Sequence, residues 1–283
     1  MLRTVRLVVL LATLGLMVSC GALIAQELPN LNSAEVLPPG QTLVQTQARF
    51  FEGSGNETLA VGIRSNLDAR RETSLWYTAI TNRGEDPLAG SVRESKWHAL
   101  SLAWKQEVSS NFLGKMLAVV ASVDLSTSGP RGTNLNTGGY AEMDGVIPAV
   151  ALPLQWRHGR TTWVTEGKVV WFENTIPNSE GGTTEGFGRI VMLGLGVTSP
   201  FLGGELIADV SAPVTGGNVI DETTGRPDDA LVWSLGWRND ILGAGMPVDL
   251  YATNASGPSL AASALAAPDN SIGFGISITR ECR

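Results

Sequence analysis

WHALSLAWKQEVSSNFLGKMLAVVASVDLS, residues 97–126, contains two segments in which apolar residues recur at every second position. In Trp97–Val108, for example, Leu102 and Trp104 alternate with small or charged residues, and Lys115–Ser126 repeats the pattern. Successive side chains of a β-strand point to opposite faces of the sheet. A period of two therefore predicts strands with one apolar face and one polar face.

The same alternation recurs along the chain from residue 41 onward, and no helical periodicity is present. Gly, Pro, Asn and Asp interrupt the chain between the alternating segments, as is typical of turns and loops. Segments of about 8–12 residues suit strands that cross a bilayer at a tilt. We expect about twelve strands, at residues 41–52, 58–65, 73–82, 97–108, 115–126, 146–157, 161–173, 189–198, 204–214, 230–238, 247–253 and 271–280.

The lengths of the connections decide between the architectures that such strands could build. Long, polar connections alternate with short ones from the third strand to the last. Residues 53–56 are the one exception to this alternation, because they form a tight turn at a position where a long loop is expected. A soluble sandwich has no reason to place every long loop at one end, whereas a membrane barrel does. We therefore predict an all-β, antiparallel, up-and-down transmembrane β-barrel with long outer loops and short periplasmic turns. The long loops are expected at residues 83–96, 127–145, 174–188, 215–229 and 254–270.

The composition excludes several other classes of protein. The 283 residues are 43% hydrophobic and only 17% charged, whereas soluble domains carry about 25% charged residues. A helical membrane protein needs several apolar runs of about 20 residues, and a disordered chain is less hydrophobic than this one. The formal net charge of −7 argues against nucleic acid as a partner.

The N-terminus has the pattern of an export signal. Arg3 and Arg6 precede the apolar run Leu7–Val18, and small residues follow, so residues 1–22 are predicted to be a signal peptide that is removed. The stretch around Cys20 also resembles a bacterial lipobox, in which the cysteine is lipidated. Cleavage at the end of the signal and lipidation at Cys20 both stay open.

The remainder divides into two parts. Residues 23–40 contain three prolines and are predicted to form a periplasmic segment that lies at the mouth of the barrel or enters it. Residues 41–283 are the predicted barrel domain. The chain has only two cysteines, so a disulfide scaffold is excluded.

The polar faces of the strands carry charges of both signs. A charge exposed to lipid near the bilayer midplane costs about 2–4 kcal/mol, so these side chains are expected to face the lumen and to pair across strands. A barrel of about twelve strands is intermediate in width between barrels that are filled by side chains and barrels that form wide pores. A narrow pore and a plugged barrel are therefore both kept as alternatives. The predicted lumen-lining residues are Arg49, Arg64, Lys105, Asp124, Glu166, Lys168, Glu205, Asp209, Arg238 and Asp249.

The sequence offers little for catalysis or for metal binding. There are two histidines, His98 and His158, and neither has a second histidine at ligand spacing, so no metal or other cofactor is expected. Ser101 is the local candidate nucleophile for His98, but three-residue spacing in a strand puts the two on opposite faces. We therefore expect no catalytic site.

The eight tryptophans lie mostly near strand ends, where barrels carry aromatic girdles at the two membrane interfaces. We expect girdle positions for seven of them: Trp76, Trp97, Trp104, Trp156, Trp163, Trp171 and Trp237.

With its predicted signal, its pattern of strands and loops, and the closing strand Ile272–Ile278, the stretch Gln41–Arg280 resembles the outer-membrane β-barrel proteins of Gram-negative-type bacteria. The resemblance is at the level of the class and points to no subfamily. Members typically end on an aromatic residue, and this chain departs from that pattern by ending in Thr279–Arg283.

The resemblance implies an outer-membrane location, lipid and small hydrophilic solutes as partners, and a role as a narrow channel or a structural envelope protein. It indicates no oligomeric state. One alternative is an exported soluble or lipid-anchored β-sandwich that binds through its loops. Another is a barrel enzyme acting on lipid through His98 or His158.

Overall fold

The structure is a computed structural model, which describes residues 27–51, 57–86, 91–128, 145–177, 183–220, 226–240, 246–267 and 270–282. The predicted signal peptide, Cys20 and the tight turn at residues 53–56 lie outside the described residues. Among the helices of the described part, none is long and apolar enough to cross a bilayer.

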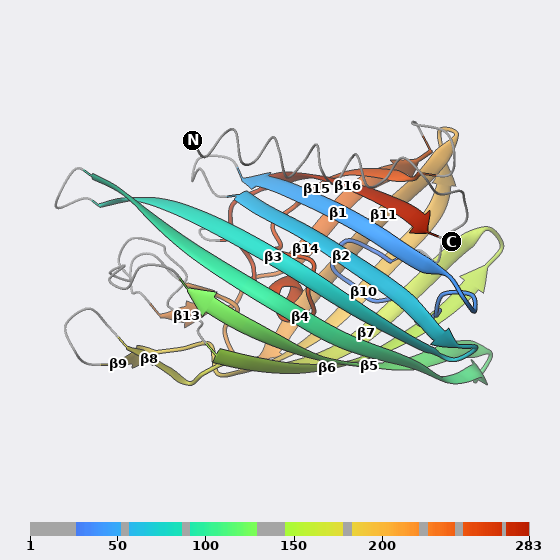
Figure 1. Ribbon diagram of the computed structural model, residues 1–283, viewed down its shortest axis with the longest axis horizontal. Helices are drawn as coiled ribbons and strands as arrows, with labels where there is room; N and C mark the ends of the chain where they lie inside the picture. Colours follow the sequence, from blue (N-terminus) through green and yellow to red (C-terminus); the bar gives the residue numbers. More distant parts are fainter. Residues whose placement is uncertain are drawn as a thin grey trace.

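Twelve strands form one closed antiparallel barrel, in which strands next to each other along the chain pair and β16 closes onto β1 (Figure 1). This confirms the predicted fold class. The barrel strands are β1 (Thr42–Phe51), β2 (Glu57–Asp68), β3 (Arg71–Asp86), β4 (Ser91–Phe112), β5 (Lys115–Ser128), β6 (Gly145–His158), β7 (Thr161–Trp171), β10 (Arg189–Phe201), β11 (Gly204–Thr215), β14 (Val232–Asn239), β15 (Val248–Thr253) and β16 (Gly273–Cys282).

The connections at the two ends of this barrel differ in length. Two-residue turns join β2 to β3, β4 to β5, β6 to β7 and β10 to β11 at one end, which we call the short-turn end. Because all neighbours are antiparallel, β1 begins and β16 finishes at that end. The opposite end, called the long-loop end, carries the four longest connections, which join β5 to β6, β7 to β10, β11 to β14 and β15 to β16. Shorter connections there join β1 to β2 and β3 to β4, and an eight-residue connection joins β14 to β15 at the short-turn end.

The alternation along each strand separates an apolar exterior from a polar interior. On β4, Leu100 and Leu102 are 41% and 49% exposed, whereas Ser101 and Lys105 between and beyond them are buried. Exposed leucines, valines, isoleucines and phenylalanines occur on strands all around the barrel. Such a surface is unstable in water and suits a lipid environment.

Three of the predicted long loops contain additional strand structure. The β3–β4 hairpin continues to Asp86 and restarts at Ser91, so most of the predicted loop at residues 83–96 is strand. The other two carry the small hairpins β8 (Thr175–Pro177) with β9 (Thr183–Glu185) and β12 (Val219–Ile220) with β13 (Pro227–Asp228). Backbone ladders outside the membrane need no apolar alternation, so the sequence pattern did not reveal them.

The predicted outer loop at residues 254–270 folds into the barrel, so its assignment as a polar outer loop is wrong. Its stretch Ala255–Ala267 is buried, apart from the half-buried Pro258, and includes the 3-10 turn η3 (Ala262–Ala264). It packs in an apolar cluster with wall residues near the long-loop end, among them Trp97 and Ile190. We call Ala255–Ala267 the inward loop.

Two of the predicted girdle tryptophans instead face the interior. Trp76 and Trp97 are 7% and 3% exposed. Trp76 fits there because its strand neighbour is Gly62, where an added Cβ would lie 2.4 Å from the indole ring. On the exterior, Trp104 and Trp171 are exposed, and Trp156 stacks on Trp163 with ring centroids 6.4 Å apart.

The apolar exterior leads to a direct test. Leu102 lies midway along β4 on the exterior, so we expect Leu102→Arg to destabilise the barrel in lipid vesicles by about 2–4 kcal/mol. Urea titration followed by the migration shift between folded and boiled protein measures this. The control is Leu202→Arg in the β10–β11 turn, where the leucine is 79% exposed. Equal destabilisation by both changes would contradict a lipid-facing β4.

Candidate functional site: the plugged lumen

Most of the described residues that precede β1 lie inside the barrel. A turn at Pro38–Gln41 reverses its direction at the rim: Gln41 N donates to Pro38 O at 3.1 Å, and Gly40 has a φ of +78°. Proline followed by glycine is the sequence signature of this type II turn. Residues Glu27–Leu37, which we call the plug, enter the lumen without regular secondary structure and are mostly buried.

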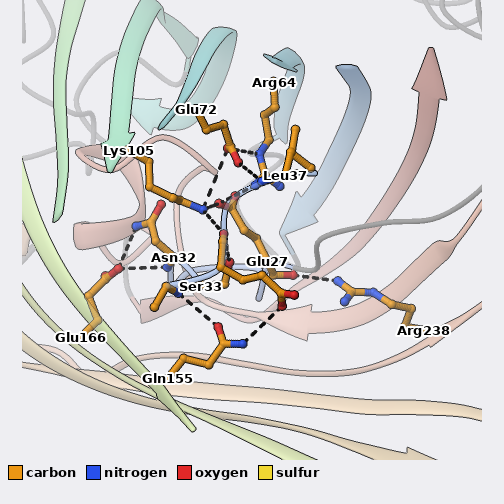
Figure 2. A network of polar contacts seen from close by, with 12 residues as sticks. Glu27, Asn32, Ser33, Leu37, Arg64, Glu72, Lys105, Gln155, Glu166 and Arg238 are labelled. Carbon is orange, nitrogen blue, oxygen red and sulfur yellow. Dashed lines mark hydrogen bonds and ion pairs between the residues drawn. The ribbon is translucent and has the colours of Figure 1, made fainter. Parts of the chain in front are cut away.

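An acidic and basic cluster holds the two ends of the plug near the short-turn end (Figure 2). The Glu27 carboxylate lies 3.1 Å from Arg64 Nη2 of β2 and 2.9 Å from Lys105 Nζ of β4. Glu72 of β3 accepts from Arg64 Nε at 2.7 Å and from the backbone N–H of Leu37 at 3.0 Å. Charge-assisted bonds of this kind are stronger than neutral ones.

Between these ends, wall side chains contact the plug backbone. One oxygen of Glu166 accepts from the backbone N–H of Asn32 at 2.9 Å and from its side-chain amide at 2.8 Å. Gln155 Oε1 accepts from the N–H of Ala34 at 3.1 Å. Lys105 donates to the carbonyl of Glu35 at 3.0 Å. The charged wall thus substitutes for the water that would otherwise solvate this backbone.

Two buried cations join the plug to the inward loop. Arg49, which is fully buried, donates to the carbonyls of Pro29 at 3.0 Å and Ala255 at 2.8 Å. Lys168 donates to the carbonyl of Asn30 at 3.1 Å and to Ser263 Oγ at 2.9 Å. Arg49 of β1 and Lys168 of β7 therefore each tie both the plug and the inward loop to the barrel wall.

The plug also has a small apolar anchor. Leu28 and Leu31 pack with Val164 and Ile207 of the wall in a separate buried cluster. Glycines on β10 make room for them: a Cβ added to Gly196 would lie 2.2 Å from Leu28 Cδ1. We call this feature, formed by Gly194 and Gly196, the glycine notch.

Nine of the ten predicted lumen-lining residues are buried, and Glu205 is half-buried. Among the described residues, two ion pairs join members of that set directly: Arg238 with Asp249 at 2.6 Å and Lys168 with Glu166 at 3.3 Å. Most of the others contact the plug or the inward loop. These side chains were expected to pair from strand to strand. Most of their contacts instead join the barrel wall to the plug or to the inward loop.

Several important residues were missed by the sequence reasoning. Glu72 precedes the predicted third strand by one position, although extending the period of two from Ser74 places it on the inner face. Gln155 and Asn66 were missed because they carry no charge. Asn66 donates to the carbonyl of Leu37. The hydroxyl of Ser259, in the inward loop, donates to Asp124 at 2.7 Å.

Two cavities flank the plug. One of about 40 Å³ lies against β3, β4 and β5. A larger one of about 280 Å³ lies against β6, β7, β10 and β11 near the short-turn end. The first is lined by Asn32, Glu72, Ser74, Ser101, Ser122 and Ser259, among others. The second is lined by Glu35, Gln155, Arg157, Thr162, Thr198 and Glu205, among others.

The histidines lie away from this filled lumen. His98 faces the exterior, where it stacks on Tyr77 with ring centroids 6.0 Å apart and shares a 2.8 Å hydrogen bond through Nδ1. Ser101 lies buried on the opposite face of β4. His158 is exposed at the end of β6. The structure brings neither histidine to Ser101.

No protein family model matches this chain, and no curated protein matches it in sequence. In structure it is similar to an outer membrane channel from Pseudomonas putida F1, with a TM-score of 0.59 and 14% identity, over 89% of this chain and 99% of that one. It is also similar to outer membrane phospholipase A from Escherichia coli, with a TM-score of 0.43 and 11% identity, over 86% of this chain and 90% of that one. At these identities the likeness concerns the architecture. The chain has the fold of the outer-membrane β-barrels.

Proposed function

We propose that this protein is a narrow outer-membrane channel for small hydrophilic solutes, exported through its N-terminal signal. Support comes from the apolar exterior of the closed barrel, its polar interior, and the likeness in fold to a bacterial outer membrane channel. The β-sandwich alternative is wrong, because the strands form one closed sheet. The enzyme alternative, which would act on lipid through His98 or His158, stays an alternative.

The observation that carries the proposal is the 40 Å³ cavity beside the plug. It extends from Glu27 and Lys105, toward the short-turn end, to Ser259 and Leu260 of the inward loop. Its volume corresponds to a few water molecules, since about 10–15 Å³ of such space holds one. Ser122 Oγ makes no hydrogen bond to protein there, so water or a passing polar solute is its natural partner.

This route predicts low conductance and a sensitive wall position. We expect the folded protein in planar bilayers to conduct far less than an unfilled twelve-stranded barrel, because plug and loop occupy its section. Ser122→Phe fills the cavity with a side chain from the wall and leaves the backbone hydrogen bonds between the strands unchanged. We expect this variant to lower the conductance several-fold. Single-channel recording measures both values.

A matched control lies one residue away. Ala121 faces the exterior of the same strand, so Ala121→Phe adds the same bulk on the lipid side and leaves the conductance unchanged. Absence of conductance in protein that shows the folded migration on gels would contradict the channel and leave a structural role. Conductance that is insensitive to Ser122→Phe would contradict the route along β3–β5.

A further inference from the structure

The filled lumen has the properties of a peptide-binding site. We propose that the inner wall recognises an extended peptide, that the plug occupies this site in cis, and that a free peptide of the same pattern binds there when the plug is displaced. The ligand class is an extended segment that resembles Glu27–Leu37, read as ELPNLNSAEVL. Binding is independent of whether the barrel conducts.

The wall recognises the plug largely through backbone groups. Wall side chains donate to five plug carbonyls and accept from three plug N–H groups. The carbonyls are those of Glu27, Pro29, Asn30, Glu35 and Leu37, and the N–H groups are those of Asn32, Ala34 and Leu37. These contacts come from strands distributed around the barrel. The wall, more than the plug's own contacts, therefore dictates the extended conformation.

Specificity comes from a few plug side chains. Asn30 donates to Asp209 at 2.8 Å and accepts from Arg49 at 3.3 Å. Leu28 and Leu31 fill the glycine notch, and Glu27 neutralises Lys105. A peptide that lacks the leucines loses apolar burial, and one that lacks the acid takes from the buried Lys105 its carboxylate partner at 2.9 Å and leaves only the more distant Glu72, at 3.9 Å.

The two fillings of the lumen differ in how they are held. The inward loop contributes to an apolar cluster of 22 buried residues, whereas the apolar anchor of the plug is a cluster of four. Polar contacts dominate at the plug, and water can replace them when it leaves. The cavity of about 280 Å³ already borders Leu28 and Glu35 near the short-turn end. The plug is therefore the exchangeable filling.

The test displaces the plug without changing the wall. The double variant Leu28→Ser with Leu31→Ser removes the apolar anchor, and a labelled synthetic peptide of residues 27–37 is titrated into the folded, detergent-solubilised protein. We expect saturable binding by fluorescence anisotropy. The unmodified protein is expected to bind the peptide about tenfold or more weakly, because its tethered plug competes at an effective concentration in the millimolar range.

Two controls tie the binding to the notch. Adding Gly196→Val to the double variant fills the space that Leu28 needs, and we expect it to weaken binding about tenfold or more. Gly167→Val is the matched control, because a Cβ there meets only Leu193, at 3.7 Å, and binding should persist. A peptide with serine at both leucine positions should bind the double variant as weakly as the native peptide binds the protein that also carries Gly196→Val.

Clear outcomes would overturn the proposal. One is absence of saturable binding to the folded double variant, and another is equal binding of the native and serine-substituted peptides. If the double variant does not fold, the single variant Leu28→Ser takes its place, since it removes from the anchor the leucine that lies against Gly196. Absence of peptide binding to that folded variant would likewise overturn the proposal.

Discussion

Replacing Arg49 by methionine will lower the free energy of unfolding by about 3–6 kcal/mol, because two buried hydrogen bonds from a charged donor are lost and each contributes about 1.5–3 kcal/mol. Arg49 has no exposed surface and donates to carbonyls of both the plug and the inward loop. Its guanidinium also lies 5.6 Å from the ring centroid of Tyr251. Methionine fills similar space but donates no hydrogen bond, so Pro29 and Ala255 lose these donors.

Urea unfolding in lipid vesicles, followed by tryptophan fluorescence and by migration of unboiled protein on gels, measures the effect. The control is Arg71→Met at the β2–β3 turn, where the arginine pairs with Asp68 in the open. We expect a change below about 1 kcal/mol for this control, because exposed pairs contribute little. An Arg49→Met protein that unfolds at the same urea concentration as the unmodified protein would show that the interior contacts do not stabilise the barrel.

Replacing Leu265 by aspartate will raise the conductance several-fold. Leu265 is fully buried within the apolar cluster that fixes the inward loop, so aspartate there would place a carboxylate among apolar side chains. An unpaired charge at such a position costs several kcal/mol, so the loop is expected to leave the lumen for water. The barrel ladder does not include the loop and stays intact.

Single-channel recording again supplies the measurement. Leu231, 56% exposed just before β14, provides the matched change Leu231→Asp, which should leave the conductance as it is. Conductance that stays low in a folded Leu265→Asp protein would mean that the inward loop does not close the long-loop end. The plug alone would then restrict the lumen.

The strands and the phase of their faces could be predicted from sequence, because a period of two is written into each segment by itself. The strand Lys115–Ser126 was expected almost as it occurs in β5 (Lys115–Ser128), whereas Trp97–Val108 is only the central part of the longer β4 (Ser91–Phe112). The destination of the loop at residues 254–270 was missed despite a usable signal. It contains no charged residue before Asp269, which is unusual for a segment in water.

The partners of the inner charges could not be predicted in the same way. Asp209 meets Asn30 across 179 positions of sequence, and Arg49 meets Ala255 across 206. Such contacts depend on where an irregular segment settles inside a closed wall, and no local period encodes that. The interior position of Trp76 likewise depends on Gly62 of the neighbouring strand, which only the register reveals.

The seam between β1 and β16 has a kinetic consequence. It joins residues far apart in the chain, as in the hydrogen bond from Gln45 to Ser277 across 232 positions, so its closure carries the largest entropic cost of any ladder in the barrel. We therefore expect this ladder to form last during folding. Because the plug is attached to β1 by a tight turn, it travels with the closing strand. The hydrogen bond from Arg49 of β1 to the carbonyl of Ala255, in the loop before β16, then stabilises the closed seam from inside the barrel.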